Sequence, residues 1–219
     1  MSKIESPYHY IAIEGNIGAG KTSLASKIAE DNNARLILEQ FEDNSFLPKF
    51  YKDQDRYAFP LELSFLAERY QQLKAGLGKG DLFKSFTITD YFINKSLIFS
   101  RKTLQQDEFK LYQTLFDIIN QSLVKPDLLV YLYANVDRLQ ANIKKRGRDY
   151  EQDIQDQYLE KIQESYFDFI KQQDGMRILI IDTNNLDFVN NDADYQYLVS
   201  IILKEYSIGI HRIKAENGL

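Results

Sequence analysis

An eight-residue stretch near the N-terminus constrains the fold more than any other feature of the chain. The pattern G-x-x-x-x-G-K-[S/T] is satisfied by Gly15, Asn16, Ile17, Gly18, Ala19, Gly20, Lys21 and Thr22, directly after an apolar segment and directly before a helical one. The three glycines let successive backbone N–H groups curl around an oxyanion, and the following helix adds its own unpaired N–H groups. The pattern therefore predicts a phosphate-binding loop between a strand and a helix.

The residues after the glycines supply a charge and a metal ligand. We expect Lys21 to reach the β- and γ-phosphates of a nucleotide, the Thr22 hydroxyl to ligate Mg²⁺, and Ser23 to line the same site. A carboxylate at the end of a neighbouring strand must hold the metal from the other side, and both Asp90 and Asp182 offer one. The residues alone do not choose between the two. The implied cofactors are ATP and Mg²⁺.

Length and composition narrow the class of protein. A chain of 219 residues is long enough for one core, so we expect a single domain over residues 1–219. The net charge of −5 provides no basic field for nucleic acid, and free nucleotides suit it better. Without cysteine, disulfides, thiolate zinc sites and cysteine nucleophiles are excluded. No apolar run approaches the ~18 residues of a membrane span, so we expect a soluble, cytoplasmic protein without a membrane partner.

Apolar runs that end in a polar residue predict five strands, at residues 10–13, 35–38, 86–89, 128–133 and 177–181. Helical patterns lie between them, at residues 19–31, 136–145, 154–172 and 194–204. Two more helices are indicated by apolar faces, formed by Leu63, Leu66, Tyr70 and Leu73, and by Phe109, Tyr112, Phe116, Ile119 and Leu123. Residues 75–80 are typical of a loop. Strands that alternate with helices imply a parallel sheet covered on both faces.

Further motifs follow the phosphate loop along most of the chain. They are Leu38-Glu39, Phe50-Tyr51-Lys52-Asp53, Phe59-Pro60-Leu61-Glu62, Lys125-Pro126-Asp127-Leu128, the run from Lys145 to Glu151, and Ile180-Ile181-Asp182. With this set the chain resembles the deoxynucleoside kinases. The resemblance implies an α/β P-loop NTPase fold whose five-stranded parallel sheet, of order 2-3-1-4-5, carries helices on both faces. That order places the third strand beside the loop strand and favours Asp90 over Asp182 as metal ligand.

The resemblance also implies roles for single residues. Glu39 would be the general base that takes the proton from a deoxynucleoside 5′-hydroxyl, and Tyr51 and Glu151 would contact the sugar 3′-hydroxyl. Asp90 would bind the substrate as well as the metal. The loop after Asp182 would lie near the adenine of ATP. Chemistry supports the first role independently, because a sugar hydroxyl is a poor nucleophile near neutral pH and a nearby carboxylate can accept its proton.

Two arginines flank Gly147 in a segment, about residues 144–153, that resembles the lid of these kinases. The guanidinium groups of Arg146 and Arg148 suit phosphate oxygens and would close over the transferring phosphoryl group. The same segment also fits a helix C-terminus with favourable cations and a glycine cap, and both interpretations can hold together. Arg146, Arg148, Lys21 and Glu39 are the predicted catalytic residues.

Three positions depart from the family pattern. Tyr91 stands where an Arg usually pairs with the catalytic carboxylate and the donor phosphates, so another cation must compensate, with Lys95 or Arg69 as candidates. Asn44 replaces a Trp, which removes one aromatic wall of the nucleoside site. Glu62 replaces a base-reading Gln, and an ionised carboxylate only accepts hydrogen bonds. Bases with an exocyclic amino group are therefore favoured over thymine.

The sequence thus predicts a deoxynucleoside kinase that transfers the γ-phosphoryl group of ATP and favours purine deoxynucleosides or deoxycytidine over thymidine. One alternative is a nucleoside monophosphate kinase of the thymidylate kinase type, whose phosphate acceptor would call for cations where this chain has Glu39, Glu42 and Asp43. Another is a non-metabolic regulatory protein that binds nucleotides, although Asn94-Lys95-Ser96-Leu97 lacks the final Asp of the guanine-specific N-K-x-D motif. A catalytically weak homologue also stays open because of Tyr91.

Two features concern assembly and the chain end. The aromatic face with Phe109, Tyr112 and Phe116 could pair two subunits, as in the homodimers of the family, or could make an internal helix contact. We expect a homodimer. The last residues, about 207–219, are expected to form a mobile tail.

Overall fold

The computed structural model describes residues 6–40, 44–78 and 83–214, and within them the chain forms two compact units. Unit 1 holds the described residues of 1–38, 81–91 and 125–219, and unit 2 those of 39–80 and 92–124. The chain leaves unit 1 after Leu38 and again after Tyr91. A single domain over residues 1–219 stays a prediction.

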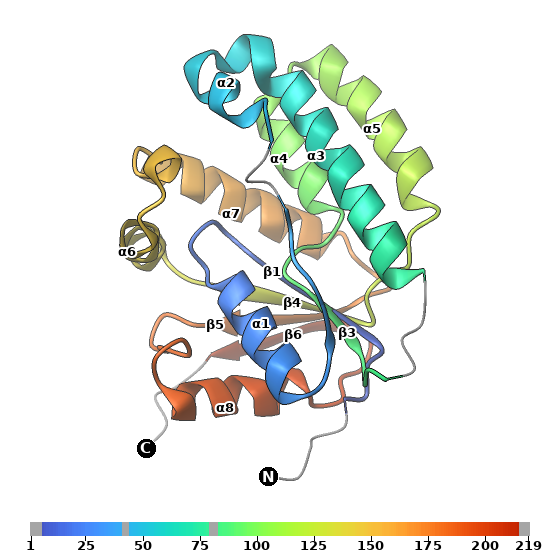
Figure 1. Cartoon of the computed structure of the whole chain (residues 1–219), viewed down its shortest axis with the longest axis vertical. Helices are drawn as coiled ribbons and strands as arrows, with labels where there is room; N and C mark the ends of the chain where they lie inside the picture. Colours follow the sequence, from blue (N-terminus) through green and yellow to red (C-terminus); the bar gives the residue numbers. More distant parts are fainter. Residues whose placement is uncertain (1–5, 41–43, 79–82, 215–219) are drawn as a thin grey trace. The chain divides into compact units, whose positions relative to one another are not determined.

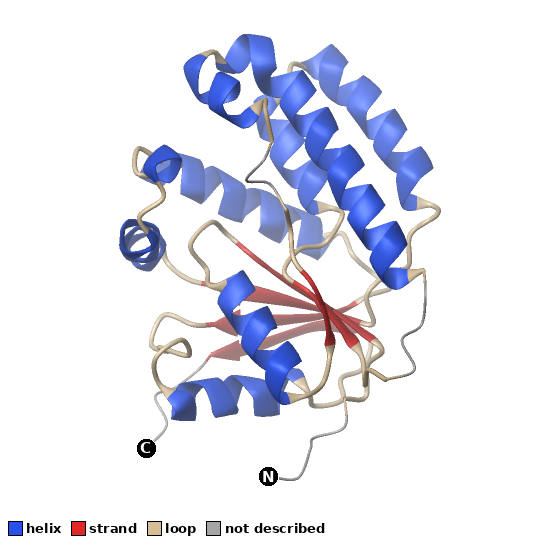
Figure 2. Ribbon diagram, in the orientation of Figure 1, coloured by secondary structure: helices blue, strands red, loops and turns tan. Residues whose placement is uncertain are grey.

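Unit 1 is built on a parallel sheet with the order β2-β3-β1-β4-β5-β6 (Figure 2). The strands are β1 (Tyr10–Gly15), β2 (Arg35–Ile37), β3 (Thr87–Thr89), β4 (Leu128–Tyr133), β5 (Arg177–Asp182) and β6 (Gly209–Lys214). The α/β class and the order 2-3-1-4-5 are confirmed, but the strand count of five is wrong. The sixth strand lies in the segment predicted as a tail, and the predicted tail residues 215–219 lie outside the described chain.

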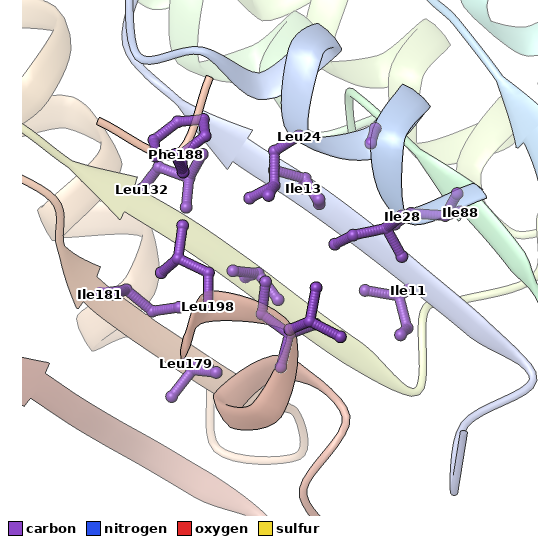
Figure 3. Close-up of a cluster of buried hydrophobic side chains, with 14 of the residues drawn as sticks. Ile11, Ile13, Leu24, Ile28, Ile88, Leu132, Leu179, Ile181, Phe188 and Leu198 are labelled. Atoms are coloured by element: carbon purple, nitrogen blue, oxygen red, sulfur yellow. The ribbon is translucent and has the colours of Figure 1, made fainter. Parts of the chain in front are cut away.

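Helices cover both faces of this sheet. They are α1 (Lys21–Asp31), α6 (Val136–Arg146), α7 (Asp156–Lys171) and α8 (Asp192–Ile202), with a 3₁₀ turn, η1, at Asp149–Glu151. Figure 1 shows α1 and α8 on one face and α7 on the other. Alternate strand residues such as Ile11 and Ile13 point to the first face and pack against Leu24 and Leu198, all buried (Figure 3). The sheet is thus held rigid beneath the loop that follows β1.

On the other face, aromatic rings join the sheet to α7. The Tyr131 ring lies 5.1 Å from that of Tyr166 and 5.5 Å from that of Phe167, measured between centroids. The Tyr166 hydroxyl donates a hydrogen bond to Glu14, a buried carboxylate on β1. These contacts fix α7 next to the strand that leads into the phosphate loop.

Unit 2 is helical, with α2 (Leu47–Lys52), α3 (Gln54–Leu77), α4 (Lys95–Thr103) and α5 (Gln106–Asn120). The helix α3 buries Leu66 and Leu73 on the predicted apolar face, and α5 buries Tyr112 and Phe116. The aromatic residues of α5 therefore serve an internal contact. The predicted loop at 75–80 is wrong for residues 75–77, which continue α3, and residues 79–80 lie outside the described chain.

Within the described residues, no helix has both the length and the apolar character needed to cross a lipid bilayer.

Candidate active site

The phosphate loop runs from the end of β1 at Gly15 to the start of α1 at Lys21. Gly18 and Gly20 have φ angles of 82° and 83°, in the left-handed region where a side chain is strained. A Cβ atom on Gly18 would also lie 2.7 Å from the backbone oxygen of Leu139. The loop thus has the shape in which its N–H groups can surround a phosphate, and Gly18 has no room for a larger residue.

The variant Gly18→Ala is expected to weaken nucleotide binding at least tenfold, because backbone strain and the clash with Leu139 would displace the loop. Calorimetric titration with ATP measures the effect. Gly175→Ala is the matched control, since a Cβ atom there meets no heavy atom within 4 Å. Unchanged affinity in Gly18→Ala would contradict the assignment of this loop.

Side chains hold the loop from within and from the neighbouring helices. Lys21 Nζ donates hydrogen bonds of 2.9 Å to the backbone oxygens of Gly15 and Asn16. Asn142 of α6 donates to the Gly18 oxygen at 2.8 Å, and Asn16 donates to the Leu159 oxygen of α7 at 2.7 Å. The lysine charge is therefore folded back across the loop, where an anion would sit.

A hydroxyl and a carboxylate meet beside the loop, as a magnesium site requires. Thr22 Oγ1 donates to Asp90 Oδ2 at 2.5 Å, and Asp90 is buried. Asp182, the alternative, instead accepts hydrogen bonds from the backbone and side-chain nitrogens of Asn184 at 3.1 and 2.7 Å. No group of three or more His, Asp or Glu residues in the described part of the chain could hold a metal alone. The two oxygens fit Mg²⁺, which takes one or two protein ligands together with phosphate oxygens and water.

A cavity of about 520 Å³ lies next to the loop in unit 1. Its walls are residues 18–23 of the loop and α1, residues of α6, and Thr183 with residues 186–189 of the loop after β5. Ala19, Gly20 and Ser23 are among them, whereas Ile17 and Asp182 are not. Asp182 shapes the wall indirectly, because it holds Asn184 in the loop after β5.

The helix α6 contributes cavity residues that the sequence prediction missed. Arg138, Asn142 and Lys145 line the cavity, and the Arg138 guanidinium donates to the Leu186 oxygen at 3.1 Å. These residues are spaced four and three apart and lead to Arg146, so they share one helix face. This spacing could have been used for prediction. Residues one and two turns before Arg146 lie on the same helix face as Arg146, so Asn142 and Arg138 could have been inferred from it.

The lid residues form one ion-pair cluster. Arg146 Nη2 pairs with Glu151 Oε2, and Arg148 Nη1 lies 3.5 Å from Glu151 Oε1. Glu151 is buried, and Gly147 caps α6 with a φ angle of 72°. The helix-end interpretation of this segment therefore holds, and Glu151 is engaged by both predicted lid arginines.

In unit 2, the buried carboxylate of Glu39 lies between two cations. Arg69 Nε and Nη2 contact Glu39 Oε1 at 2.8 and 2.7 Å, and Lys95 Nζ pairs with Glu39 Oε2. Arg69 Nη1 also donates to Ser96 Oγ at 2.8 Å, so the guanidinium is fixed on two sides. Burial raises the pKa of Glu39, but the charges and hydrogen bonds of Lys95 and Arg69 outweigh it and lower the pKa to about 2. Both cations proposed to replace the missing Arg thus contact the predicted base.

Glu62 lies on the same helix as Arg69 and is 4% exposed. Thr103 Oγ1 of α4 donates to Glu62 Oε1 at 2.8 Å, and the Tyr112 hydroxyl of α5 donates to the Glu62 backbone oxygen at 3.3 Å. Burial raises the pKa of Glu62 to about 7, although the Arg69 charge and the Thr103 hydrogen bond oppose that rise. Burial thus favours the protonated form of Glu62 more than it is favoured in an ordinary exposed carboxyl group.

Two further positions singled out from the sequence, Asn44 and Tyr91, are buried. Asn44 is buried and donates to Ser64 Oγ at 2.8 Å, so it joins the start of α2 to α3. Tyr91 is fully buried in unit 1. The backbone of Tyr51 belongs to α2, but its side chain lies outside the described part of the structure, as do Glu42 and Asp43.

These features define a class of protein. A glycine-rich loop between a strand and a helix, a lysine folded across it, and a hydroxyl–carboxylate pair beside it are the parts of a P-loop phosphotransferase.

Comparisons with known proteins narrow the class. The family model "Deoxynucleoside kinase" matches residues 11–206. Deoxyguanosine kinase of Bacillus subtilis (strain 168) is 36% identical, over 87% of this chain and 94% of that protein, and deoxyadenosine kinase of Dictyostelium discoideum is 31% identical, over 90% and 79%. A solved structure of deoxyadenosine kinase from M. mycoides, with products dCMP and a flexible dCDP bound, has a TM-score of 0.74 at 26% identity, over 88% of this chain and 98% of that one. The chain therefore belongs to the deoxynucleoside kinase family, and it is a kinase that phosphorylates a deoxynucleoside.

Proposed function

We propose that this kinase transfers the γ-phosphoryl group of ATP to the 5′-hydroxyl of a purine deoxynucleoside, with Glu39 as general base. The observation that carries the proposal is the Glu39 carboxylate, whose side chain is 8% exposed and is held between Arg69 and Lys95. A carboxylate fixed in this way stays ionised and keeps one orientation. Those are the properties needed to accept a proton from a hydroxyl group.

The low pKa of Glu39 is compatible with this role. Phosphoryl transfer has a loose transition state with little bonding to the nucleophile, so catalysis depends more on position and charge than on base strength. The hydroxyl proton becomes acidic as the bond to phosphorus forms, and Glu39 then needs to be ionised and within reach. Arg69, held by Ser96 as well, orients the carboxylate.

The donor side is assigned to unit 1. The loop N–H groups and Lys21 would bind the β- and γ-phosphates, and the cavity bordered by Arg138 and Phe188 would take the nucleoside part of ATP. Thr22 and Asp90 would hold Mg²⁺, which neutralises phosphate charge when it is bound. When ATP binds, Arg146 and Arg148 would leave their ion pairs with Glu151 and bind phosphate oxygens instead. Sugar contacts by Tyr51 and Glu151 stay predictions.

Glu62 supports a preference among bases. A carboxylate accepts hydrogen bonds, and adenine, guanine and cytosine each offer an exocyclic amino group whereas thymine offers none. The similar proteins named for deoxyguanosine and deoxyadenosine favour the purines within this set. We therefore place deoxyguanosine and deoxyadenosine ahead of deoxycytidine, with thymidine last.

The test is ADP release from ATP and Mg²⁺ with each of the four deoxynucleosides and, in parallel, with the four deoxynucleoside monophosphates. Turnover with purine deoxynucleosides is the expected result. Turnover with monophosphates alone would identify the monophosphate kinase instead. Nucleotide binding without turnover in either set would identify the regulatory protein, with Tyr91 as the mark of lost activity.

We also propose that the protein is a homodimer that uses the outer face of α5. Leu111 and Ile118 are 54% and 64% exposed on that helix, which is unusual for large apolar side chains gathered on one element. The doubly charged variant Leu111→Glu/Ile118→Glu is expected to be monomeric. Light scattering coupled to size exclusion measures the mass, and a monomeric parent protein would refute the proposal. A cytoplasmic location stays a prediction from the sequence.

A further inference from the structure

The residues on either side of Gly15 carry buried polar side chains. Glu14, directly before the phosphate loop, is 2% exposed, and Asn16 is 1% exposed. A buried carboxylate beside an anion-binding loop is unfavourable, because burial costs free energy and a bound phosphate would repel its charge. The hydrogen bonds of Glu14 must therefore offset that cost.

The carboxyl group of Glu14 joins the start of the loop to helix α7. Its Oε2 atom accepts the Tyr166 hydroxyl at 2.8 Å and the Gly15 N–H at 3.3 Å. The Tyr166 ring is buried and packs against the Tyr131 ring, with 5.1 Å between the centroids. Tyr166 is thus held in a defined position by the sheet and holds Glu14 in turn.

Asn16 makes a second attachment to the same helix. Its Nδ2 atom donates to the Leu159 oxygen at 2.7 Å, and its Oδ1 atom accepts the Ile17 N–H at 2.9 Å. Leu159 and Tyr166 are close to two helical turns apart, so they lie on one face of α7 and about 10 Å apart along its axis. Two separate attachments fix the orientation of the loop entrance as well as its position, which a single hydrogen bond would not do.

These attachments do not involve Lys21. Lys21 Nζ donates to the Gly15 and Asn16 oxygens at 2.9 Å, but under the proposed function it has to turn to the β- and γ-phosphates. The loop entrance then loses the hydrogen bonds from Lys21, whereas those that Glu14 and Asn16 make to α7 can remain. The attachments to α7 are therefore suited to keep the shape of the loop while Lys21 changes partner.

We propose that Tyr166 is a positioning residue for ATP, which acts through Glu14 to hold the start of the phosphate loop in the shape that binds phosphate. Asn16, bonded to Leu159, holds the adjoining part of the loop in the same way. Tyr166 is 152 positions from Glu14 in the chain, so no sequence motif joins the two. The inference rests on the proposed function, in which the loop binds the phosphates of ATP.

The variant Tyr166→Phe keeps the ring and removes the hydroxyl. It is expected to bind ATP about tenfold more weakly, because a loop that has lost one attachment must be ordered when phosphate binds. Calorimetric titration gives the Kd for ATP. The KM for ATP should rise by the same factor, while the KM for the deoxynucleoside stays at the parent value. An ATP affinity equal to that of the parent protein would overturn the proposal.

Two other tyrosines of unit 1 provide matched controls. The Tyr195 hydroxyl of α8 donates to Asp31 Oδ2 of α1 at 2.6 Å, so Tyr195→Phe removes a bond of the same kind away from the loop. The Tyr131 hydroxyl is buried and has no hydrogen-bond partner among the described residues, so Tyr131→Phe removes a hydroxyl but no bond from the ring cluster. Both variants should bind ATP with parent affinity. If Tyr166 only supported the fold, Tyr166→Phe and Tyr195→Phe would lose similar stability in urea and neither would lose ATP affinity.

Variants of Glu14 show whether Tyr166 acts through it. Glu14→Leu removes the acceptor and is expected to weaken ATP binding about tenfold, whereas Glu14→Gln keeps an acceptor oxygen and should stay within about threefold of the parent affinity. Adding Tyr166→Phe to Glu14→Leu should cause no further loss, because the shared bond is already absent. A further tenfold loss in the double variant would show that the two residues act independently.

The second attachment has its own test, which leaves Glu14 in place. Asn16→Ala removes the bond to the Leu159 oxygen and is expected to weaken ATP binding about tenfold as well. Unchanged affinity would contradict an anchoring role for α7.

Calorimetry with ATP separates this inference from the proposed function, because it needs no acceptor. If the parent protein turned over no deoxynucleoside, the proposed function would fail, and the ATP affinity of Tyr166→Phe would still decide the role of Tyr166. If the parent protein turned over deoxynucleosides and Tyr166→Phe bound ATP as tightly, the proposed function would stand and the role of Tyr166 would be refuted.

Discussion

Glu39→Gln is expected to lower kcat by ~10² to 10⁴, the usual contribution of a positioned base. Glutamine has the shape of glutamate but cannot accept the hydroxyl proton. Its amide hydrogens also face Lys95 or Arg69, which hold the two carboxylate oxygens in the parent protein. Rates of ADP release at saturating ATP and deoxynucleoside measure the loss.

Two controls accompany this variant. ATP affinity, measured by calorimetry, should be unchanged because Glu39 is proposed to act on the acceptor hydroxyl, whereas the loop N–H groups and Lys21 are proposed to bind the ATP phosphates. Glu160→Gln, at an exposed position of α7, should keep parent turnover. Circular dichroism must confirm that Glu39→Gln is folded, because two buried cations lose their counter-charge. A folded variant with kcat within threefold of the parent value would remove Glu39 from the role of base.

Arg69→Met is expected to destabilise the protein by about 3–5 kcal/mol, the typical effect of removing one partner from a buried ion pair. Arg69 is 4% exposed, contacts Glu39 through two nitrogens and Ser96 through the third, and lies 5.0 Å from the centre of the Phe65 ring. The variant would leave the Glu39 carboxylate buried and paired with Lys95, without the Arg69 charge. Urea unfolding at pH 7 gives the free energy of unfolding.

A second substitution shows whether the effect is specific. Glu39→Gln in the Arg69→Met background removes the isolated charge and should recover part of the lost stability, whereas additive losses would show that the two residues are not coupled. Arg101→Met, at an exposed position of α4, should change stability by less than about 0.5 kcal/mol.

The contribution of Glu39 to stability also has a defined pH window. Its pKa is lowered in the folded protein, so folding favours the ionised form, and the contribution is complete above the ordinary pKa of 4.5. It is lost as the pH falls from 4.5 to about 2. The pKa of Glu62 is raised instead, so the stability linked to it is complete below 4.5 and falls as the pH rises towards 7.

Much of the fold was predictable because central parallel strands are buried on both faces and appear as continuous apolar runs. The strand at residues 128–133 has the predicted bounds for this reason. The strand β6 was missed because it lies at the edge of the sheet, where Ile210, Arg212 and Lys214 are exposed and alternate with half-buried residues. An edge strand of mixed polarity gives no apolar run near a chain end.

The end of α3 shows a second limit. Gly76 and Gly78 indicate a loop by propensity, yet the helix continues to Leu77 and Gly76 is buried on the same side as Leu73. Packing of a helix face overrides the preference of a single glycine, which amounts to about 1 kcal/mol.

The site was predictable where its parts are adjacent in sequence, as in the phosphate loop. The cluster of Glu39, Arg69 and Lys95 joins residues 30 and 56 positions apart, and no local pattern encodes that pairing. Family resemblance named Glu39, and the Arg missing at Tyr91 made Arg69 and Lys95 candidates to replace it, but the contacts of these residues depend on the packing of α3 against α4. The ion pairs of Arg146 and Arg148 with Glu151 could not be predicted from the sequence either, because an ion pair depends on side-chain directions as well as on spacing.

The connection between the two units has a consequence for how the chain folds. The strand β1 pairs with β3 and with β4, and both pairings span chain that belongs to unit 2. The first spans residues 39–80, and the second spans residues 39–80 and 92–124. The helices of unit 2 form through contacts close in sequence, whereas the central sheet forms by closing these long loops at an entropic cost. We therefore expect assembly of the sheet that carries the phosphate loop to be the slow step of folding, so that the nucleotide-binding part of this kinase becomes native last.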